Sequence, residues 1–177
     1  MITLNEERIV QFIGDHPGCY LREIRRNLKI SMGSAQYNLY QLENRGRVVS
    51  VKRGIHKFFF LKGIFGDYEK NLLQILNRVT SRKILMVIVE QKNPTQSDIV
   101  QHVGISHASL HRYIDQLKRF NIIKEASDGR YKRYELLGKN STDLILALFK
   151  NYYSNIWIKW SERLTEMYLA MSQDDNN

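Results

Sequence analysis

The chain has 177 residues, a single cysteine and a formal net charge of +9 at pH 7. One cysteine excludes an internal disulfide, and the chain has no apolar run near 18 residues, so we expect no membrane span and a location in the reducing cytoplasm. Residues 1–66 carry 11 Lys and Arg against 5 Asp and Glu, residues 67–140 carry 13 against 8, and residues 141–177 carry 3 against 5. Positive charge confined to the first two segments predicts that these segments bind a polyanion.

The first segment shows the start and stop signals of three helices. Thr3 and Glu6 have capping-box spacing, and the helix that they open should end before Pro17. A second short helix is predicted at about residues 20–28. Ser31 is a suitable N-cap for a third helix that runs to about residue 45 and buries an apolar stripe of Ala35, Leu39 and Leu42.

A hairpin is predicted to follow the third helix. Gly46 is the residue expected just past a helix end, residues 48–51 alternate with a strand period, and Arg53-Gly54 is a turn before a return strand at residues 55–61. Strand alternation buries Phe59 and leaves Phe58 and Phe60 on the other face, free to pack on the linking helix or on another subunit. Three helices and a hairpin predict a winged helix-turn-helix domain over residues 1–64, in which the hairpin is the wing.

The same order of elements is predicted again after a linking helix over residues 65–79. Ser81 should cap the first helix of this second domain, residues 80–138, and Thr95 with Asp98 forms another capping-box pair. Ser106 should cap its third helix, and Asp128-Gly129 is a strong hairpin turn signal.

The two domains are copies of one another, because residues 24–61 reappear 75 positions later as residues 99–136. A long period with only two copies indicates tandem domains and not a solenoid. Twelve positions of the first copy match the second: Ile24, Leu28, Ile30, Ser31, Ser34, Leu39, Leu42, Val48, Gly54, Lys57, Phe59 and Leu61.

Residues 141–172 are predicted to form one long C-terminal helix of about 45 Å, too long to be covered by one small domain. We expect its apolar face to form a homodimer interface, with packing on its own domain as the alternative. That face consists of Ile145, Leu148, Tyr152, Ile156, Trp160, Leu164 and Met171. The predicted fold class is therefore mainly α with small β-hairpins (α+β), with two tandem winged domains followed by a long helix.

The third helix of each copy should carry the recognition chemistry, since the second helix of a helix-turn-helix enters the major groove. Arg can contact guanine in bidentate fashion, Gln can pair with adenine, and Ser or Tyr can hold phosphate; the alternative is an ordinary solvated face. The predicted DNA-binding side chains of these helices are Ser34, Gln36, Tyr37 and Gln41 in the first copy and Ser109, His111, Arg112 and Gln116 in the second.

Basic residues flank both predicted wing turns, and phosphate or minor-groove contact is their expected role. They are Lys52, Arg53 and Lys57 in the first wing and Arg130, Lys132 and Arg133 in the second. A hairpin kept soluble by surface charge is the alternative.

The segment ISHASLHRYIDQL at residues 105–117, followed by Asn121-Ile-Ile123, resembles the recognition helix and wing entry of MarR- and ArsR-type winged-helix regulators. Residues 30–42 with Arg45-Gly46 are a weaker copy, and the tandem arrangement resembles two-domain regulators common in archaea. The resemblance implies that Ser109, His111 and Arg112 contact DNA. Tyr37 stands at the position of Arg112 in the first copy.

Catalysis and cofactors are not expected. His107 and His111 are four residues apart on a helix, but no thiolate pair or carboxylate cluster accompanies them, so a DNA-facing role explains them better than a metal site. No phosphate-binding glycine loop, nucleophile elbow or metalloprotease motif is present.

The sequence thus predicts a transcriptional regulator that binds double-stranded DNA, acts as a homodimer and has no identified effector. The main alternative is an architectural winged-helix protein that binds other proteins in a replication, segregation or transcription assembly. RNA binding is a third possibility, although the aromatic residues fall mostly on core stripes.

Overall fold

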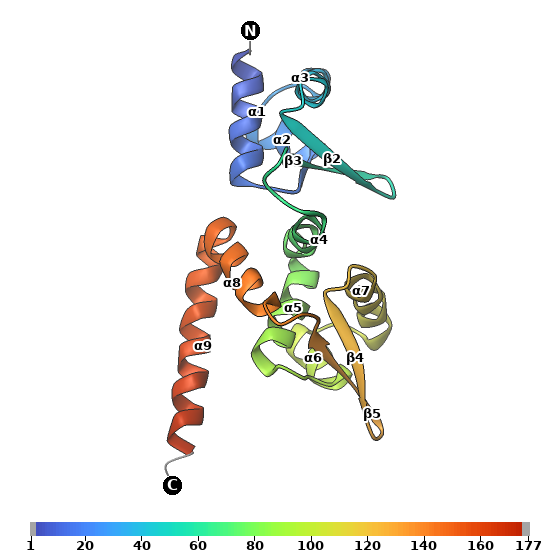
Figure 1. The fold of residues 1–177 in the computed structure, drawn as a ribbon, viewed down its shortest axis with the longest axis vertical. Coiled ribbons are helices and arrows are strands. Elements are labelled where there is room, and N and C mark those ends of the chain that lie inside the picture. The colour runs from blue at the N-terminus through green and yellow to red at the C-terminus, as the bar shows by residue number, and fades with distance from the viewer. Residues whose placement is uncertain (1–2, 175–177) are drawn as a thin grey trace. The chain divides into compact units, whose positions relative to one another are not determined.

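The computed structural model describes residues 3–174, with side chains described through residue 166, and it is a mixed α+β structure (Figure 1). The chain divides between Arg82 and Lys83 into two compact units. No helix within the described residues is both long enough and apolar enough to cross a membrane.

The first unit contains three helices, a three-stranded antiparallel sheet of order β1-β3-β2 and a further helix. Its elements are α1 (Leu4–Asp15), β1 (Cys19–Tyr20), α2 (Leu21–Leu28), α3 (Met32–Asn44), β2 (Val48–Arg53), β3 (His56–Leu61) and α4 (Asp67–Leu76). The predicted Thr3–Glu6 capping box is present, and Ser31 caps α3 by accepting a hydrogen bond from the Ser34 amide at 3.1 Å.

The core of the first unit lies between α1, α2, α3 and the sheet. The predicted α3 stripe of Ala35, Leu39 and Leu42 is buried, as are Ile9 and Ile13 of α1. An ion pair joins α1 to the end of α3, because the exposed Arg45 contacts the buried Glu6 carboxylate at 2.9 Å. The Thr3 amide and Arg45 together lower the pKa of Glu6, so the carboxylate stays charged and α3 is held against α1.

Both faces of β3 are covered, because Phe58, Phe59 and Phe60 are all buried. Phe60 packs against the ring of Phe65, which precedes α4, with ring centroids 6.2 Å apart. The prediction that Phe60 packs toward the linking region is therefore confirmed within the chain. The two-residue strand β1 pairs with β3 and was not predicted, since two residues carry no periodic signal.

The second unit repeats the helix, helix, helix, strand, strand order and adds two helices. Its elements are α5 (Val79–Gln91), whose first turn precedes the division, α6 (Gln96–Val103), α7 (His107–Arg119), β4 (Ile123–Asp128), β5 (Tyr131–Leu136), α8 (Ser141–Tyr152) and α9 (Ser154–Asp174). Thr95 and Asp98 form the predicted capping box, and Ser106 caps α7. Ser81 does not cap a helix as predicted, because α5 begins two residues earlier and buries it.

The 75-residue offset holds in the strand register. Val48 pairs with Leu61 and Arg53 with His56 in the first hairpin, and the corresponding second-hairpin pairs are Ile123 with Leu136 and Asp128 with Tyr131. The β1 contact of Tyr20 with Phe58 also recurs, as an isolated bridge between Thr95 and Arg133. The two hairpins therefore present equivalent positions in the same geometry.

The C-terminal segment is not the single long helix that we predicted. It breaks at Tyr153, and α9 turns back to pack against α8 (Figure 1). The cause is tertiary: Trp160 is 1% exposed, its ring lies 4.6 Å from that of Phe149, and its indole N–H donates to Glu90 of α5. Met171 of the predicted dimer face lies outside the described side chains.

Replacing Trp160 by Ala should destabilise the second unit by about 3 to 5 kcal/mol, because it removes a fully buried indole and leaves Glu90 without this donor. Trp157, half-buried one turn earlier, is the matched control, and Trp157→Ala should cost much less. Urea unfolding followed by circular dichroism measures both. Equal losses for the two variants would show that Trp160 does not anchor α9.

Candidate nucleic-acid interface

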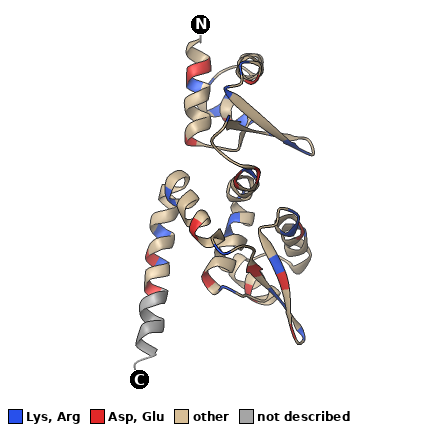
Figure 2. Ribbon diagram, viewed as in Figure 1, with Lys and Arg blue, Asp and Glu red and all other residues tan. Residues whose placement is uncertain are grey.

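The predicted recognition residues lie at the surface of the described structure. Nine of them are exposed: Gln36, Tyr37, Lys52, Arg53, Lys57, His111, Arg112, Arg130 and Lys132. Five are half-buried: Ser34, Gln41, Ser109, Gln116 and Arg133. Figure 2 marks Lys and Arg positions along α7 and toward the ends of both hairpins.

The exposed face of α7 offers cationic and hydrogen-bonding groups from its first turns. His111 and Arg112 follow the Ser106 cap, and neither side chain makes a hydrogen bond or ion pair with other described residues. Both are therefore available to an external ligand. An unpaired guanidinium on the exposed side of a helix-turn-helix can contact guanine O6 and N7 in bidentate fashion.

Ser34 of α3 and Ser109 of α7, which occupy corresponding positions, already make hydrogen bonds within their own units. The Ser34 hydroxyl accepts from Asn38 Nδ2 at 3.3 Å, and the Ser109 hydroxyl accepts from Ser106 at 3.1 Å. Asn38 is buried and also accepts from Thr3 Oγ1 at 3.2 Å. Both hydroxyls thus accept hydrogen bonds from within their own units, whereas the Arg112 guanidinium makes none with other described residues.

One lysine in each wing, Lys57 or Lys132, is paired with a carboxylate, which the sequence did not indicate. In the first unit Glu43 of α3 contacts Lys57 at 2.8 Å and accepts from Ser50. In the second unit Glu125 of β4 contacts Lys118 at 3.2 Å and Lys132 at 3.1 Å. The three positions of each cluster correspond at the 75-residue offset, since Glu43, Ser50 and Lys57 align with Lys118, Glu125 and Lys132. The carboxylate therefore lies on the helix in the first copy and on the strand in the second.

These ion pairs shift the pKa values of Glu125 and Lys132 in the second wing. The hydrogen bond from Lys132, followed by Lys118, lowers the pKa of Glu125, and Glu125 raises the pKa of Lys132. Arg133 is likewise held by Asp128 at 3.1 Å and by the Asn93 carbonyl. Arg53 donates to Asn71 at 2.8 Å, whereas Lys52 and Arg130 form no such contact with described residues.

A groove of about 790 Å³ lies between the first wing and the starts of α2 and α3. Met32 and Gln36 line it from α3, and His56 and Lys57 line it from the wing. Three of the residues that line it were not predicted to be functional: Arg22, His56 and Arg78. Arg22 and Arg78 lie outside the third helix and the wing. His56 lies in the wing, but the prediction there considered only Lys and Arg.

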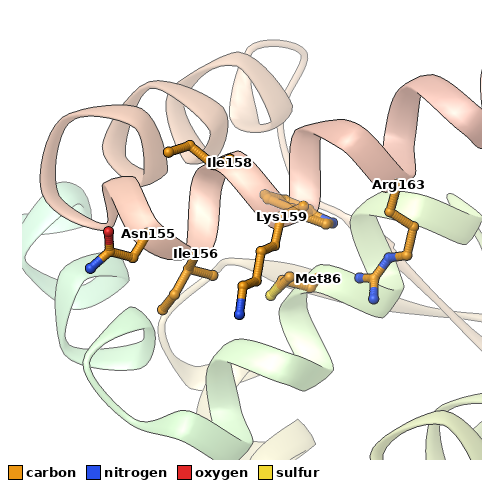
Figure 3. A pocket seen from close by; sticks show the side chains of 7 residues that line it. Met86, Asn155, Ile156, Ile158, Lys159 and Arg163 are labelled. Carbon is orange, nitrogen blue, oxygen red and sulfur yellow. The ribbon is translucent and has the colours of Figure 1, made fainter.

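A second hollow, of about 620 Å³, lies between α5 and α9 of the second unit. Figure 3 shows Ile156 and Lys159 of α9 beside Met86 of α5 at this hollow. Ile158 on the same helix is 55% exposed. Apolar groups thus remain accessible on α9 after Trp160 has been buried.

Metal binding gains no support from the described residues. His107 and His111 are both exposed, and no group of three or more His, Cys, Asp or Glu side chains is placed to hold an ion within residues 3–166. Cys19 is buried, and its burial raises the pKa of the thiol, so it is a core residue.

Comparison with known proteins agrees with this geometry. Residues 3–73 match the family model HTH_HVO_0163_N, described as an N-terminal HTH domain. The chain is 24% identical over 131 residues to an uncharacterized HTH-type transcriptional regulator, MJ1398, of Methanocaldococcus jannaschii. The match covers 72% of this chain and 32% of that relative, so the chain spans about a third of the relative's length.

Two solved structures are also similar to this chain. The transcriptional repressor BigR of Xylella fastidiosa has 20% identity and a TM-score of 0.40, covering 45% of this chain and 81% of its own. Overoxidized AbfR bound to DNA has 17% identity and a TM-score of 0.40, covering 86% and 97%. The chain has the element order of a winged helix-turn-helix fold in each unit, and its residues 3–73 carry the N-terminal HTH domain of that family model.

If the wing lysines contact phosphate, their carboxylate partners restrain them, so Glu125→Gln should strengthen binding to random duplex about three- to tenfold at low salt. The variant removes one negative charge and frees Lys118 and Lys132. Lys132→Gln is the matched control and should weaken binding. Fluorescence anisotropy with a labelled duplex measures both, and unchanged affinity in the two variants would contradict phosphate contact by this wing.

Proposed function

We propose that the protein is a DNA-binding transcriptional regulator, with no catalytic activity, that reads duplex DNA with two winged helix-turn-helix units in the cytoplasm. The observation that carries this proposal is the surface of the second unit made by Arg112 on α7 and Arg130 at the wing turn, two exposed guanidiniums without partners among the described residues, with the exposed imidazole of His111 next to Arg112. Helix and wing present this charge in the geometry that places one in the major groove and the other against the backbone or minor groove.

The second unit is the principal base reader in this proposal. Arg112 offers two parallel donors to guanine, whereas Tyr37 at the equivalent position of α3 offers one hydroxyl. The first unit contributes phosphate contacts through Lys52 and through the cations that line its groove. Affinity then comes from both units, and sequence preference comes mainly from α7.

Replacing Arg112 by Ala should cost about 1 to 3 kcal/mol on a selected site and relax the preference at one base pair, because a bidentate contact is lost. Tyr37→Ala, the matched change in the first unit, should weaken the selected site less. A site is first selected from random duplexes with the full chain, and anisotropy titrations then compare the variants. A larger loss for Tyr37→Ala would reverse the proposed division, and no duplex binding by the wild type would favour a protein-binding architectural role.

We also propose that the chain forms a homodimer through the face of α9 that remains accessible. Ile145, Leu148 and Trp160 are buried within the unit, so the interface would use Ile156, Ile158 and Met86 around the hollow of Figure 3. This face is smaller than the one predicted from the sequence. It retains apolar groups that are ordinarily covered in a stable protein.

Ile158→Lys should convert the dimer to a monomer without unfolding the unit, because Ile158 is more than half exposed. Lys150→Ala, at an exposed position of α8 that does not line the hollow, is the control and should leave the dimer intact. Sedimentation velocity at micromolar concentration decides the question. A wild-type chain that sediments as a monomer would contradict the proposed interface.

A further inference from the structure

The turns of the two wings carry different kinds of side chain at equivalent positions, an apolar one in the first wing and a cationic one in the second. The turn of the first wing is Gly54-Ile55, and the turn of the second is Gly129-Arg130, 75 residues later. Ile55 is 93% exposed, more than any other exposed large apolar side chain among the described residues. The apolar residue therefore stands where the second copy places a guanidinium.

Cations surround Ile55 on both strands of the first wing. Lys52 pairs across the hairpin with Lys57, and Arg53 pairs with His56, so like or potentially like charges stand directly opposite each other. Such pairs destabilise a hairpin. Glu43 and Asn71 each contact one member of these pairs, Lys57 and Arg53 respectively, and Lys52 has no such partner in the described structure. The second wing lacks this arrangement, since Ser127 pairs with Lys132 and Asp128 with Tyr131.

An apolar wing tip that is flanked by cationic side chains is complementary to the minor groove of duplex DNA. Two phosphate walls flank that groove, and architectural proteins insert an isoleucine, leucine or methionine between base steps there and kink the duplex. Pyrimidine–purine steps open most easily. The groove beside the wing, of about 790 Å³, is lined by Ile55 and His56 of the wing and by Met32 and Gln36 of α3.

Two unpaired guanidiniums lie along the same groove. Arg22 at the start of α2 and Arg78 both line it, and neither guanidinium makes a hydrogen bond or ion pair with other described residues. Glu23 is the only acid among the described residues that line the groove, and its carboxylate accepts from the Tyr20 amide at 3.1 Å. The groove is therefore complementary to a polyanionic strand along its length.

We propose that the first wing inserts Ile55 into the minor groove at a pyrimidine–purine step and kinks the duplex, while Arg130 of the second wing contacts an unkinked minor groove. This inference rests on the proposed DNA binding and adds a mechanical role to it. The first unit reads the deformability of DNA, and the second unit reads base edges.

The test uses the full chain and 30-base-pair duplexes that carry donor and acceptor dyes at their ends and 2-aminopurine beside repeated TpA steps. Wild type should shorten the distance between the ends and raise 2-aminopurine fluorescence. Ile55→Ala should bind within about threefold of wild type but lose most of both signals, and Ile55→Met should keep them, because methionine also acts as a wedge.

Arg130→Ala is the control in the second wing, and it should weaken binding while leaving the bend of the bound duplex unchanged. A duplex without pyrimidine–purine steps should bend less. Bound wild type without bending or fluorescence change, or Ile55→Ala that bends DNA as wild type does, would overturn the wedge while leaving DNA binding intact. No binding to any duplex would overturn both the wedge and the proposed function.

Discussion

The attachment of each recognition helix to its own hairpin is the constraint on which the proposed interface depends. In the first unit the Arg47 amide donates to Leu42 of α3 at 2.9 Å, and the Lys62 amide donates back to Arg47 at 3.1 Å. The second unit has the same pair of bonds, from Ile122 to Leu117 and from Leu137 to Ile122. Helix and wing are thus held at one spacing in both copies, whatever side chains they carry.

That fixed backbone allows the surface chemistry of the two copies to differ. The lysine at the equivalent wing position is paired with a carboxylate in both units, Lys57 with Glu43 of α3 and Lys132 with Glu125 of β4. The unpaired groups differ much more, as Ile55 replaces Arg130 and Tyr37 replaces Arg112. Two units of one fold can therefore make different contacts with a single duplex.

Local signals in the sequence predicted most of the fold. The Thr3–Glu6 and Thr95–Asp98 boxes, the Ser31 and Ser106 caps and the α3 stripe were confirmed, because each depends on residues close together in the chain, whereas the predicted Ser81 cap was wrong. The break at Tyr153 was missed because no glycine or proline marks it. It results from the burial of Trp160 against Phe149 and Glu90, and Glu90 is 70 residues away along the chain.

The positions of the candidate site residues could be predicted from the sequence, but their ion-pair partners could not. Recognition helices and wings followed from the repeat, and their selected side chains lie at the surface. The carboxylate partners of Lys57 and Lys132 could not be predicted, since Glu43 lies 14 positions before Lys57 and Glu125 lies on the opposite strand. Arg22 and Arg78 joined the groove only through tertiary packing.

The most direct test of the account is the affinity of the full chain for random duplex DNA as a function of salt. About five phosphate contacts would give a slope of about −4 to −5 in log K against log salt concentration, because each contact releases condensed counterions with a coefficient near 0.9. A steep, linear fall of this kind is the result that the account predicts. Binding that does not change with salt, or the absence of binding at low salt, would contradict it.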